Sequence, residues 1–531
     1  MTIFGFKKIF NYFSIFTIIL GSAFGPFYTA NAADLTLTAA DAWNDGDGGV
    51  LDSPTANDNV DVDGFIMSIK KSADIGAITD SDAVARDDAG DVLITSDVLS
   101  ADLTITIGSL HNEGLVDIKT LDADNSTMNV TFEGAFDTKQ TLNIETTEVT
   151  ANDDLTVTFA GAVTTGGAIT IVADGNGLGS RSSDVTVNVA GHLTNGADSS
   201  LNDNGGGLAK LVLNGTGAQT IAKEIEGASA GEGTVQNSNT GNTVTFTEEL
   251  GSTNELLALT HDASSTTVHT LAVDAITVTS AGTETYSAGL FKATTYNKTA
   301  GSATFDATNA GDTINNIAGS GPADLNMSES TTINFTIASG EASNVDAVID
   351  GTSAGFGTLT FKNTDANAPG IYTVEDTIGA NASIAAITIG SSTVAGSIAT
   401  EAAAIIAGAV TVVGGDAAAE DSQLDAGANI TAGSIALTPN TGDAILDITA
   451  NATIAATIDA VGSGAANAIV EITGGTGTFS SAVGGTTAVD SFTLVDGTAA
   501  AINEDFKATT TTITDAATIT YDKGGDQTHT G

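Results

Sequence analysis

The sequence is dominated by short segments in which apolar residues alternate with threonine or asparagine. The segment 103–107 reads Leu-Thr-Ile-Thr-Ile, and 155–159 reads Leu-Thr-Val-Thr-Phe. A period of two places β-branched or aromatic side chains on one face of a strand and polar side chains on the other. Similar segments lie at 128–132, 185–189, 211–213, 244–246, 276–278, 333–337, 359–361, 387–389, 410–412 and 435–437. Glycine, asparagine, aspartate and serine separate them and supply turns. The pattern predicts an all-β fold.

The spacing of these segments favours stacked coils. Leu103 begins one segment and Met128 begins the next, and Val410 and Ile435 are related by the same interval. A period in the twenties has the length of one solenoid coil, whereas sandwich domains show turn signals about every 8–12 residues without a longer repeat. The prediction is an elongated β-solenoid, similar to a parallel β-helix, with β-sandwich-like portions left open as an alternative. The alanine-rich run 399–409 is the best helix candidate, but its paired isoleucines and a glycine argue against a helix.

Composition and repetition divide the chain into four regions. We expect a signal peptide at 1–32, an N-terminal capping region at 33–100, solenoid repeats at 101–290 and further repeats at 291–531. The boundary at 291 rests on an internal similarity, because the sequence Phe-Lys-Ala-Thr-Thr occurs at 291–295 and again at 506–510. We expect the last region to continue beyond Gly531 or to end without a membrane anchor.

The N-terminal segment 1–32 has the order of parts typical of a secretory signal. Lys7 and Lys8 are basic, 9–24 is mostly apolar, and 30–32 reads Ala-Asn-Ala. Signal peptidase cleaves after such a small-x-small pattern. A membrane helix is the alternative, but the apolar run is short and no charged cluster follows it. We therefore expect cleavage after Ala32 and no transmembrane segment in the mature chain.

Charge and cysteine content narrow the classes of partner. Without Lys7 and Lys8 the chain keeps 13 basic residues against 65 acidic ones, a formal charge of −52. A field of this sign repels nucleic acids and anionic lipids and favours divalent counter-ions, so we expect no nucleic-acid partner. Because the chain has no cysteine, its stability must come from packing and backbone pairing.

The most distinctive candidate site lies near the start of the mature chain. Asn59, Asp61 and Asp63, followed by Gly64, imitate the opening of a calcium loop. The twelfth position of that loop is Lys70, where a bidentate glutamate is required, so a standard EF-hand is excluded. An irregular calcium site remains a candidate, and Asx turns around the first strand are the alternative that we prefer. The candidate ligands are Asp45, Asp47, Asn59, Asp61 and Asp63.

No group of residues matches a catalytic motif, and we predict a protein that is not an enzyme and has no certain cofactor. His261, Asp262 and Ser264, with His269 nearby, have the residue types of a hydrolase triad, but no G-x-S-x-G sequence surrounds the serine. Acidic pairs such as 87–88 and 153–154 have the chemistry used by polysaccharide-cleaving enzymes. Because aromatic residues that would stack on sugars are scarce, solvated loops are the favoured role of these acids.

Two parts of the sequence carry a family resemblance. The first part lies near the mature start. It begins with Trp43 and continues with a turn rich in glycine and aspartate, Pro54 and the segment 58–62. Further along, 211–221 reads Leu-Val-Leu-Asn-Gly-Thr-Gly-Ala-Gln-Thr-Ile. In these features the chain resembles extracellular β-solenoid proteins of Gram-negative bacteria, namely surface-layer proteins and autotransporter passenger domains, including the rickettsial outer-membrane surface antigens. The resemblance covers most of 33–531 in style, but specific motifs cover only a small part.

The resemblance implies an exported protein on the extracellular surface of a Gram-negative bacterium, associated with the outer membrane. Our first hypothesis is a structural protein that forms a coat or display rod by lateral assembly with itself or with cell-surface components, stabilised by calcium. The second is an adhesin that binds a receptor on a host or neighbouring cell. The third is a polysaccharide-degrading β-helix enzyme. Autotransporters carry a C-terminal membrane barrel, whereas this sequence ends Gly-Gly-Asp-Gln-Thr-His-Thr-Gly.

Overall fold

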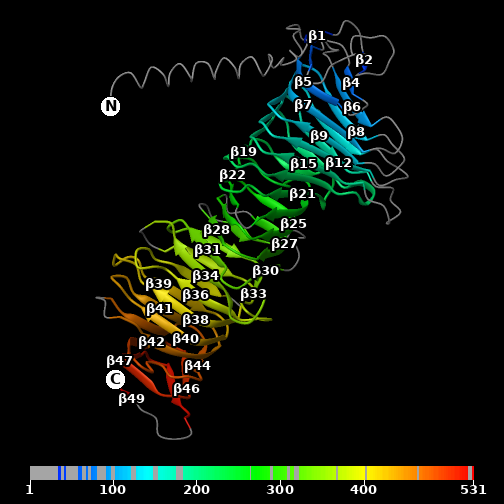
Figure 1. Cartoon of the computed structure of the whole chain (residues 1–531). Coiled ribbons are helices and arrows are strands. Elements are labelled where there is room, and N and C mark those ends of the chain that lie inside the picture. Colours follow the sequence, from blue (N-terminus) through cyan, green and yellow to red (C-terminus); the bar gives the residue numbers. More distant parts are fainter. Residues whose placement is uncertain are drawn as a thin grey trace, which may run out of the picture.

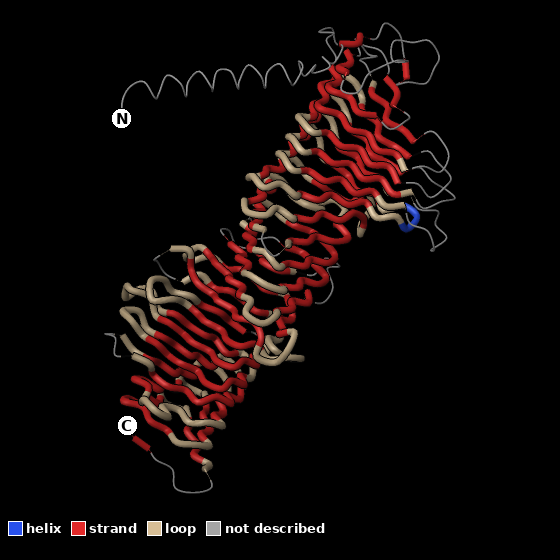
Figure 2. The backbone as a smooth tube through the Cα atoms, in the orientation of Figure 1, coloured by secondary structure: helices blue, strands red, loops and turns tan. Residues whose placement is uncertain are grey.

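The computed structural model is a parallel β-solenoid. It describes residues 34–36, 41–42, 58–61, 67–69, 73–79, 91–96, 102–120, 127–146, 153–174, 183–262, 265–287, 291–307, 311–315, 322–365, 369–400, 403–462, 466–523 and 529–530. Figure 1 shows a rod along which the chain advances from one end to the other. Strands make up most of the backbone, and the described residues include one short 3-10 helix, η1 (Asn204–Gly206), drawn blue in Figure 2.

Strands from successive turns stack into three faces, which we number in the order in which the chain visits them. The first face contains β5 (Ala73–Thr79), β7 (Leu103–Asn112), β9 (Thr127–Phe132), β12 (Asp154–Phe159), β15 (Val185–Val189), β18 (Ala209–Leu213), β21 (Glu232–Asn237), β23 (Leu256–His261), β25 (Val273–Ser280), β27 (Phe291–Lys298), β30 (Ala323–Met327), β33 (Ala347–Gly351), β44 (Thr476–Phe479), β46 (Ala499–Ile502) and β48 (Thr518–Tyr521). The second face contains β1 (Asp34–Thr36), β3 (Asp58–Asp61), β10 (Phe136–Thr138), β13 (Val163–Thr165), β16 (Leu193–Asn195), β19 (Gln219–Ile221), β22 (Thr243–Phe246), β24 (Thr266–His269), β26 (Thr283–Tyr286), β28 (Ser302–Ala307), β31 (Thr332–Ile337), β34 (Phe356–Asn363) and β36 (Ile384–Ile389).

The third face lies between the end of one second-face strand and the start of the next first-face strand. In the N-terminal half it contains β2 (Asp41–Ala42), β4 (Met67–Ile69), β6 (Val92–Ser96), β8 (Val116–Thr120), β11 (Leu142–Thr146), β14 (Ile169–Val172), β17 (Ser199–Asn202) and β20 (Ile225–Gly227). In the C-terminal half it contains β29 (Gly311–Ile314), β32 (Ala342–Val345), β35 (Ile371–Val374), β37 (Ser397–Thr400), β39 (Ser422–Ala426), β41 (Ala444–Ile448), β43 (Ala468–Ile472), β45 (Val489–Leu494), β47 (Phe506–Ile513) and β49 (His529–Thr530). The strands β5 and β7, and the long strands β38 (Ile405–Val413), β40 (Ile430–Thr438) and β42 (Ala452–Ala460), bend from the first face into the second.

Each strand pairs in parallel with the strand one turn away, at the spacing that the sequence predicts. Leu103 lies opposite Met128, and Val410 lies opposite Ile435. The parallel pairing found throughout the described residues confirms the solenoid and leaves no sandwich-like portion among them, because sandwiches pair antiparallel strands. The helix candidate 399–409 contains no helix among its described residues, because 399–400 end β37 and 405–409 begin β38. Pairing continues from β25 through β27 to β30, across the expected boundary at 291.

A column of glycines occupies the bend between the first and second faces in the N-terminal half. It contains Gly108, Gly134, Gly161 and Gly191, each one turn from the next. A Cβ atom on Gly161 would lie 2.3 Å from the carbonyl oxygen of Gly134, far inside van der Waals contact. Glycine is therefore required here because the neighbouring backbone takes the space of a side chain.

The inward side chains of the three faces form one continuous hydrophobic cluster along the rod. A ladder of aromatic rings runs through it on the second face, and its neighbouring members stack with centroids 4.8–5.6 Å apart. The ladder consists of Phe246, His269, Tyr286, Phe305, Phe335 and Phe361. Because each turn buries its apolar face only against its neighbours, stability arises from stacking along the whole rod.

Candidate functional site

The calcium candidates fall mostly outside the described residues. Asp45, Asp47 and Asp63 are not among them. Asn59 and Asp61 belong to β3, where they lie opposite Asp34 and Thr36 of β1. Within the described part of the chain, no three histidine or acidic side chains gather in a group that could hold a metal ion. The calcium site therefore remains a prediction.

The residues considered for a hydrolase do not come together as a triad. Ser264 lies outside the described residues. His261 points into the solenoid, where its Nε2 atom lies 3.4 Å from Nε2 of His269. Asp262 instead accepts hydrogen bonds from the side chains of Gln236 and Ser238. A histidine–carboxylate contact does occur at the surface of another turn, where Nδ1 of His111 lies 2.8 Å from Asp137.

The structure describes only one of the two acidic pairs considered for polysaccharide cleavage. Residues 87 and 88 lie outside the described residues. Asp153 is buried, whereas Asp154 is exposed at the start of β12. A carboxylate of Asp154 accepts the backbone N–H of Asp184 in the next turn, which is a structural role.

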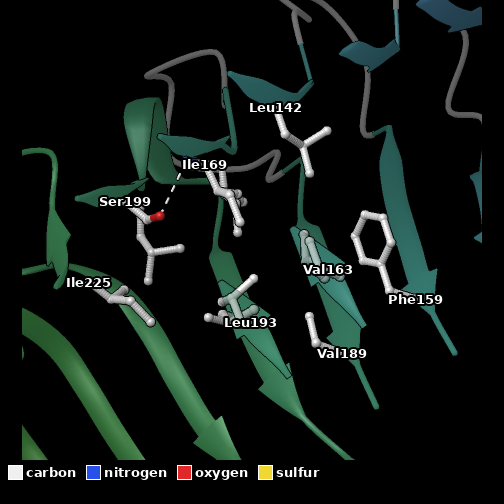
Figure 3. Close-up of a pocket in the computed structure, with 12 residues that line it drawn as sticks. Leu142, Phe159, Val163, Ile169, Val189, Leu193, Ser199 and Ile225 are labelled. Carbon is white, nitrogen blue, oxygen red and sulfur yellow. Dashed lines mark hydrogen bonds between the residues drawn. The ribbon is translucent and has the colours of Figure 1, made fainter. Parts of the chain in front are cut away.

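A small cavity of about 10 Å³ lies inside the N-terminal half of the rod (Figure 3). Its lining is apolar apart from Ser199, whose hydroxyl oxygen accepts the backbone N–H of Ile169 at 3.2 Å. A space of this size holds at most one water molecule. Leu142, Phe159, Val163 and Leu193 are among the other lining residues.

A buried ion pair lies in the interior where β25, β26 and β27 meet. Lys298 and Glu284 have fully inaccessible side chains, and Nζ of Lys298 lies 2.8 Å from Oε2 of Glu284. The ammonium group also donates to the Gly282 carbonyl at 2.7 Å and to the Ser280 hydroxyl at 3.0 Å. Glu284 receives further hydrogen bonds from the hydroxyls of Ser280 and Tyr296. The pair is thus hydrogen-bonded on both sides, as a buried pair must be.

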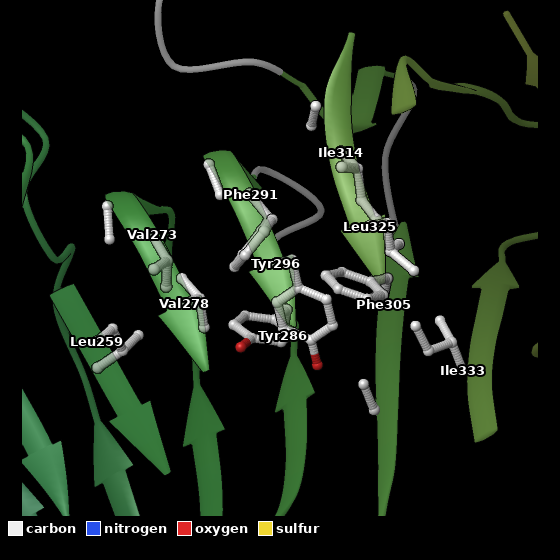
Figure 4. Packing of buried hydrophobic residues seen from close by; sticks show 14 of the residues in the cluster. Leu259, Val273, Val278, Tyr286, Phe291, Tyr296, Phe305, Ile314, Leu325 and Ile333 are labelled. Carbon is white, nitrogen blue, oxygen red and sulfur yellow. The ribbon is translucent and has the colours of Figure 1, made fainter. Parts of the chain in front are cut away.

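Burial and mutual attraction act in opposite directions on this pair. Burial raises the pKa of Glu284, and the Lys298 charge and the three donors oppose that rise. Burial likewise lowers the pKa of Lys298, and Glu284 opposes that fall. Burial also raises the pKa of Tyr296 well above 10, so its hydroxyl keeps its proton and donates it to Glu284. Figure 4 shows Tyr286, Tyr296 and Phe305 close together around this part of the interior.

The two interior histidines are neutral. Burial, with a smaller effect of the Lys298 charge, lowers the pKa of His261 from 6.5 to about 3. Burial also lowers the pKa of His269 well below 6.5. His269 stacks between Phe246 and Tyr286 at centroid distances of 4.9 Å, so it serves as a rung of the aromatic ladder. Among the described residues, Nδ1 of each histidine and the Tyr286 hydroxyl have no hydrogen-bond partner.

Sequence reasoning missed this interior polar group, although the alternation contained a signal. In β27, Tyr296 and Lys298 are two positions apart and therefore share a side of the strand. Lysine is almost never fully buried, which is why an inward position was not expected.

Part of the outer surface consists of regular polar columns. On the first face, Thr104 lies opposite Asn129, and Thr106 lies opposite Thr131. Such columns display hydroxyl and amide groups at about 4.8 Å intervals along the rod. The described residues contain no helix long and apolar enough to cross a membrane.

Comparison with protein-family models, curated proteins and solved structures found no match to this chain. Any functional assignment therefore has to come from the rod itself: its filled interior, its charge and its repeating outer faces.

Proposed function

We propose that this protein is a non-enzymatic structural protein exported to the surface of a Gram-negative bacterium, where rods associate side by side into a coat or display layer. The observation that carries the proposal is the uninterrupted stack, which has one continuous hydrophobic interior and repetitive outer faces. A rod of this kind offers long lateral surfaces. It has no need of a cleft.

The chemistry of the interior supports a structural role. The cavity has a volume of only about 10 Å³, and its lining is apolar apart from Ser199. Two pairs of ionisable groups inside the rod are inaccessible: Lys298 contacts Glu284, and His261 contacts His269. Groups with this burial serve packing, because no dissolved substrate reaches them.

The charge of the chain sets a condition on assembly. A formal charge of −50 makes copies repel one another, which favours soluble monomers at low ionic strength. Divalent cations screen and bridge carboxylates more effectively than sodium does. We therefore propose that rods associate when calcium is present and separate when it is removed.

The test uses the full chain expressed with its own leader in a Gram-negative host. Proteinase digestion of intact cells measures surface exposure, and sedimentation velocity of the recovered protein measures association. We expect rapidly sedimenting assemblies in calcium and monomers in chelator, with sodium chloride of equal ionic strength as the control. A protein that remains inside intact cells, or that stays monomeric in calcium at all concentrations, would overturn the proposal.

The adhesin hypothesis remains the second candidate, favoured by the same flat hydroxyl-bearing columns. It predicts that the monomeric rod binds cells saturably without associating with itself. Saturable binding by a protein that shows no assembly in calcium would support this alternative against the coat.

A further inference from the structure

The second face carries a long surface of uncharged side chains. Two adjacent columns of outward positions run in register through nine strands, β22, β24, β26, β28, β31, β34, β36, β38 and β40. From Thr243 to Ser434, the first column reads Thr, Thr, Thr, Ser, Thr, Thr, Ala, Ala and Ser. From Thr245 to Ala436, the second column reads Thr, Val, Thr, Thr, Asn, Thr, Thr, Thr and Ala. We call these two columns the hydroxyl array.

The uncharged columns of the first face are shorter. One run ends where Lys210 follows Thr186 in the next turn. The next run ends where Asp324 follows Thr295. The second face therefore offers the longest uninterrupted row of turns on which a large uncharged partner can rest, in a chain whose formal charge is −50.

The hydroxyl groups of the array are not used by the fold. All of its side chains are at least partly accessible, and none of its hydroxyls makes a hydrogen bond to another described residue. In the next column, by contrast, the hydroxyls of Thr247 and Thr270 donate to carbonyl oxygens of the preceding turn, at 3.0 and 3.1 Å. Because a free hydroxyl both donates and accepts, the array can hydrogen-bond to a partner outside the chain.

The aromatic ladder lies on the inner side of the same strands and keeps the array regular. Neighbouring rings of the ladder are parallel to within 3–19°. Figure 4 shows two of them, Tyr286 and Phe305, in the interior. Sheets normally twist from strand to strand, and ladders of stacked side chains hold them flat. Threonine adds order of its own, because branching at Cβ restricts χ1.

The spacing of the array has two repeats. Neighbouring strands are about 4.8 Å apart, and alternate residues of one strand are about 6.7 Å apart. Over nine strands the array is about 40 Å long. Water molecules in hexagonal ice form rows with repeats close to both distances. Threonine methyl groups order the adjacent layer of water, and the hydroxyls hydrogen-bond to it.

We propose that the hydroxyl array binds the surface of ice. A crystal of water presents the same rows over the whole length of the array, so many weak contacts form together and their effects combine. Crystalline polysaccharide also has a repeat, but it is bound by stacking on exposed aromatic rings, and the array contains none. Ice binding needs only a single rod, so this activity does not depend on the proposed assembly into a coat.

The test measures how much protein a growing ice crystal takes up. The full chain, in chelator and together with serum albumin, is frozen slowly onto a cold surface. We expect the chain to be enriched in the ice while albumin stays in the liquid, and we expect a gap between the melting and freezing temperatures of small crystals.

Matched variants locate the surface. Thr360→Tyr places a ring in the middle of the array, where it prevents the neighbouring hydroxyls from reaching a flat surface, so we expect at least about tenfold less protein in the ice. Thr373→Tyr makes the same change at an outward position of the third face in the same turn. Thr131→Tyr makes it in a shorter uncharged run of the first face. We expect both of these controls to bind ice like the unmodified chain.

Exclusion of the unmodified chain from ice would overturn the proposal, as would equal uptake of Thr360→Tyr and Thr373→Tyr. A loss in Thr131→Tyr as large as that in Thr360→Tyr would overturn the assignment to the second face. Circular dichroism and thermal unfolding show whether each variant keeps its fold, and Thr388→Tyr in the same column replaces Thr360→Tyr should the latter unfold at a lower temperature. Sedimentation velocity in the same buffer shows single rods, so failure of the proposed coat leaves this result unchanged.

Discussion

The neutral histidines inside the rod make its stability depend on pH in a way that one substitution isolates. His269 is fully buried, and burial holds its pKa well below the 6.5 expected in the unfolded chain. The unfolded state therefore binds a proton below pH 6.5 that the folded state does not bind. Stability is complete above about pH 6.5 and falls as the pH decreases toward the folded pKa.

The size of this effect follows from the shift. One pH unit below 6.5, a buried neutral histidine costs the folded state about 1.4 kcal/mol relative to pH 7.5. His269→Phe removes this cost, and the phenyl ring keeps the stacking between Phe246 and Tyr286. We expect the difference in unfolding free energy between variant and unmodified chain to change by about 1.4 kcal/mol, in favour of the variant, between pH 7.5 and pH 5.5.

Urea unfolding followed by circular dichroism at the two pH values measures this difference. Carboxyl groups whose pKa burial raises, such as those of Asp447 and Glu471, act in the opposite direction, but they are present in both proteins and cancel in the comparison. His192→Gln is the control, because His192 is exposed and its Nδ1 accepts the backbone N–H of Thr220. If the unfolding free energies of His269→Phe and the unmodified chain differ by the same amount at both pH values, the assignment of a buried neutral ring is refuted.

Four further outcomes follow from the interior, the glycine column and the calcium candidates. Lys298→Met leaves the carboxylate of Glu284 buried without its counter-charge, so we expect it to lower the unfolding free energy by about 3–5 kcal/mol. Replacing both residues by apolar ones restores most of that free energy. Equal losses in the single and double variants would contradict this expectation. Phe335→Ala removes a rung of the aromatic ladder and costs about 3–5 kcal/mol in urea unfolding, and a loss below about 1 kcal/mol would show that the ladder closes over the gap. Gly161→Ala lowers the melting temperature because its methyl group meets the backbone of the previous turn, and an unchanged melting temperature would show that the turns can separate there. Calcium raises the melting temperature of the full chain and raises it less in Asp61→Asn; identical shifts would exclude Asp61 as a ligand.

The alternation of residues predicted the strands and their stacking for a clear physical reason. A period of two fixes which side chains are buried, and the distance between segments fixes the length of a turn. Leu359 and Ile387 begin successive apolar segments of the sequence and lie opposite each other in the structure. Val410 begins the segment after Ile387, at a shorter interval, and lies opposite Ile387 as well. Segment spacing thus predicted register as well as fold class.

The interior charges and the uncharged parts of the outer surface could not be predicted from the pattern in the same way. Lys298 occupies an inward position because Glu284, which belongs to the adjacent second-face strand, compensates its charge. This contact depends on how the first and second faces meet. The uncharged parts of the outer surface depend on register over several turns. Thr131 belongs to an uncharged surface only because Thr106 and Thr158 lie on either side of it.

Turn length varies widely while the interior columns stay in register. Val278 lies opposite Tyr296 across a short turn. Leu155 lies opposite Val185 across a turn with more than 1.5 times as many residues. The additional residues of a long turn lie between paired strands and leave the stacked positions unchanged. Peptides inserted at such connections would therefore be displayed at regular intervals along the rod. The connecting segments can change in sequence and length while the hydrophobic core stays the same.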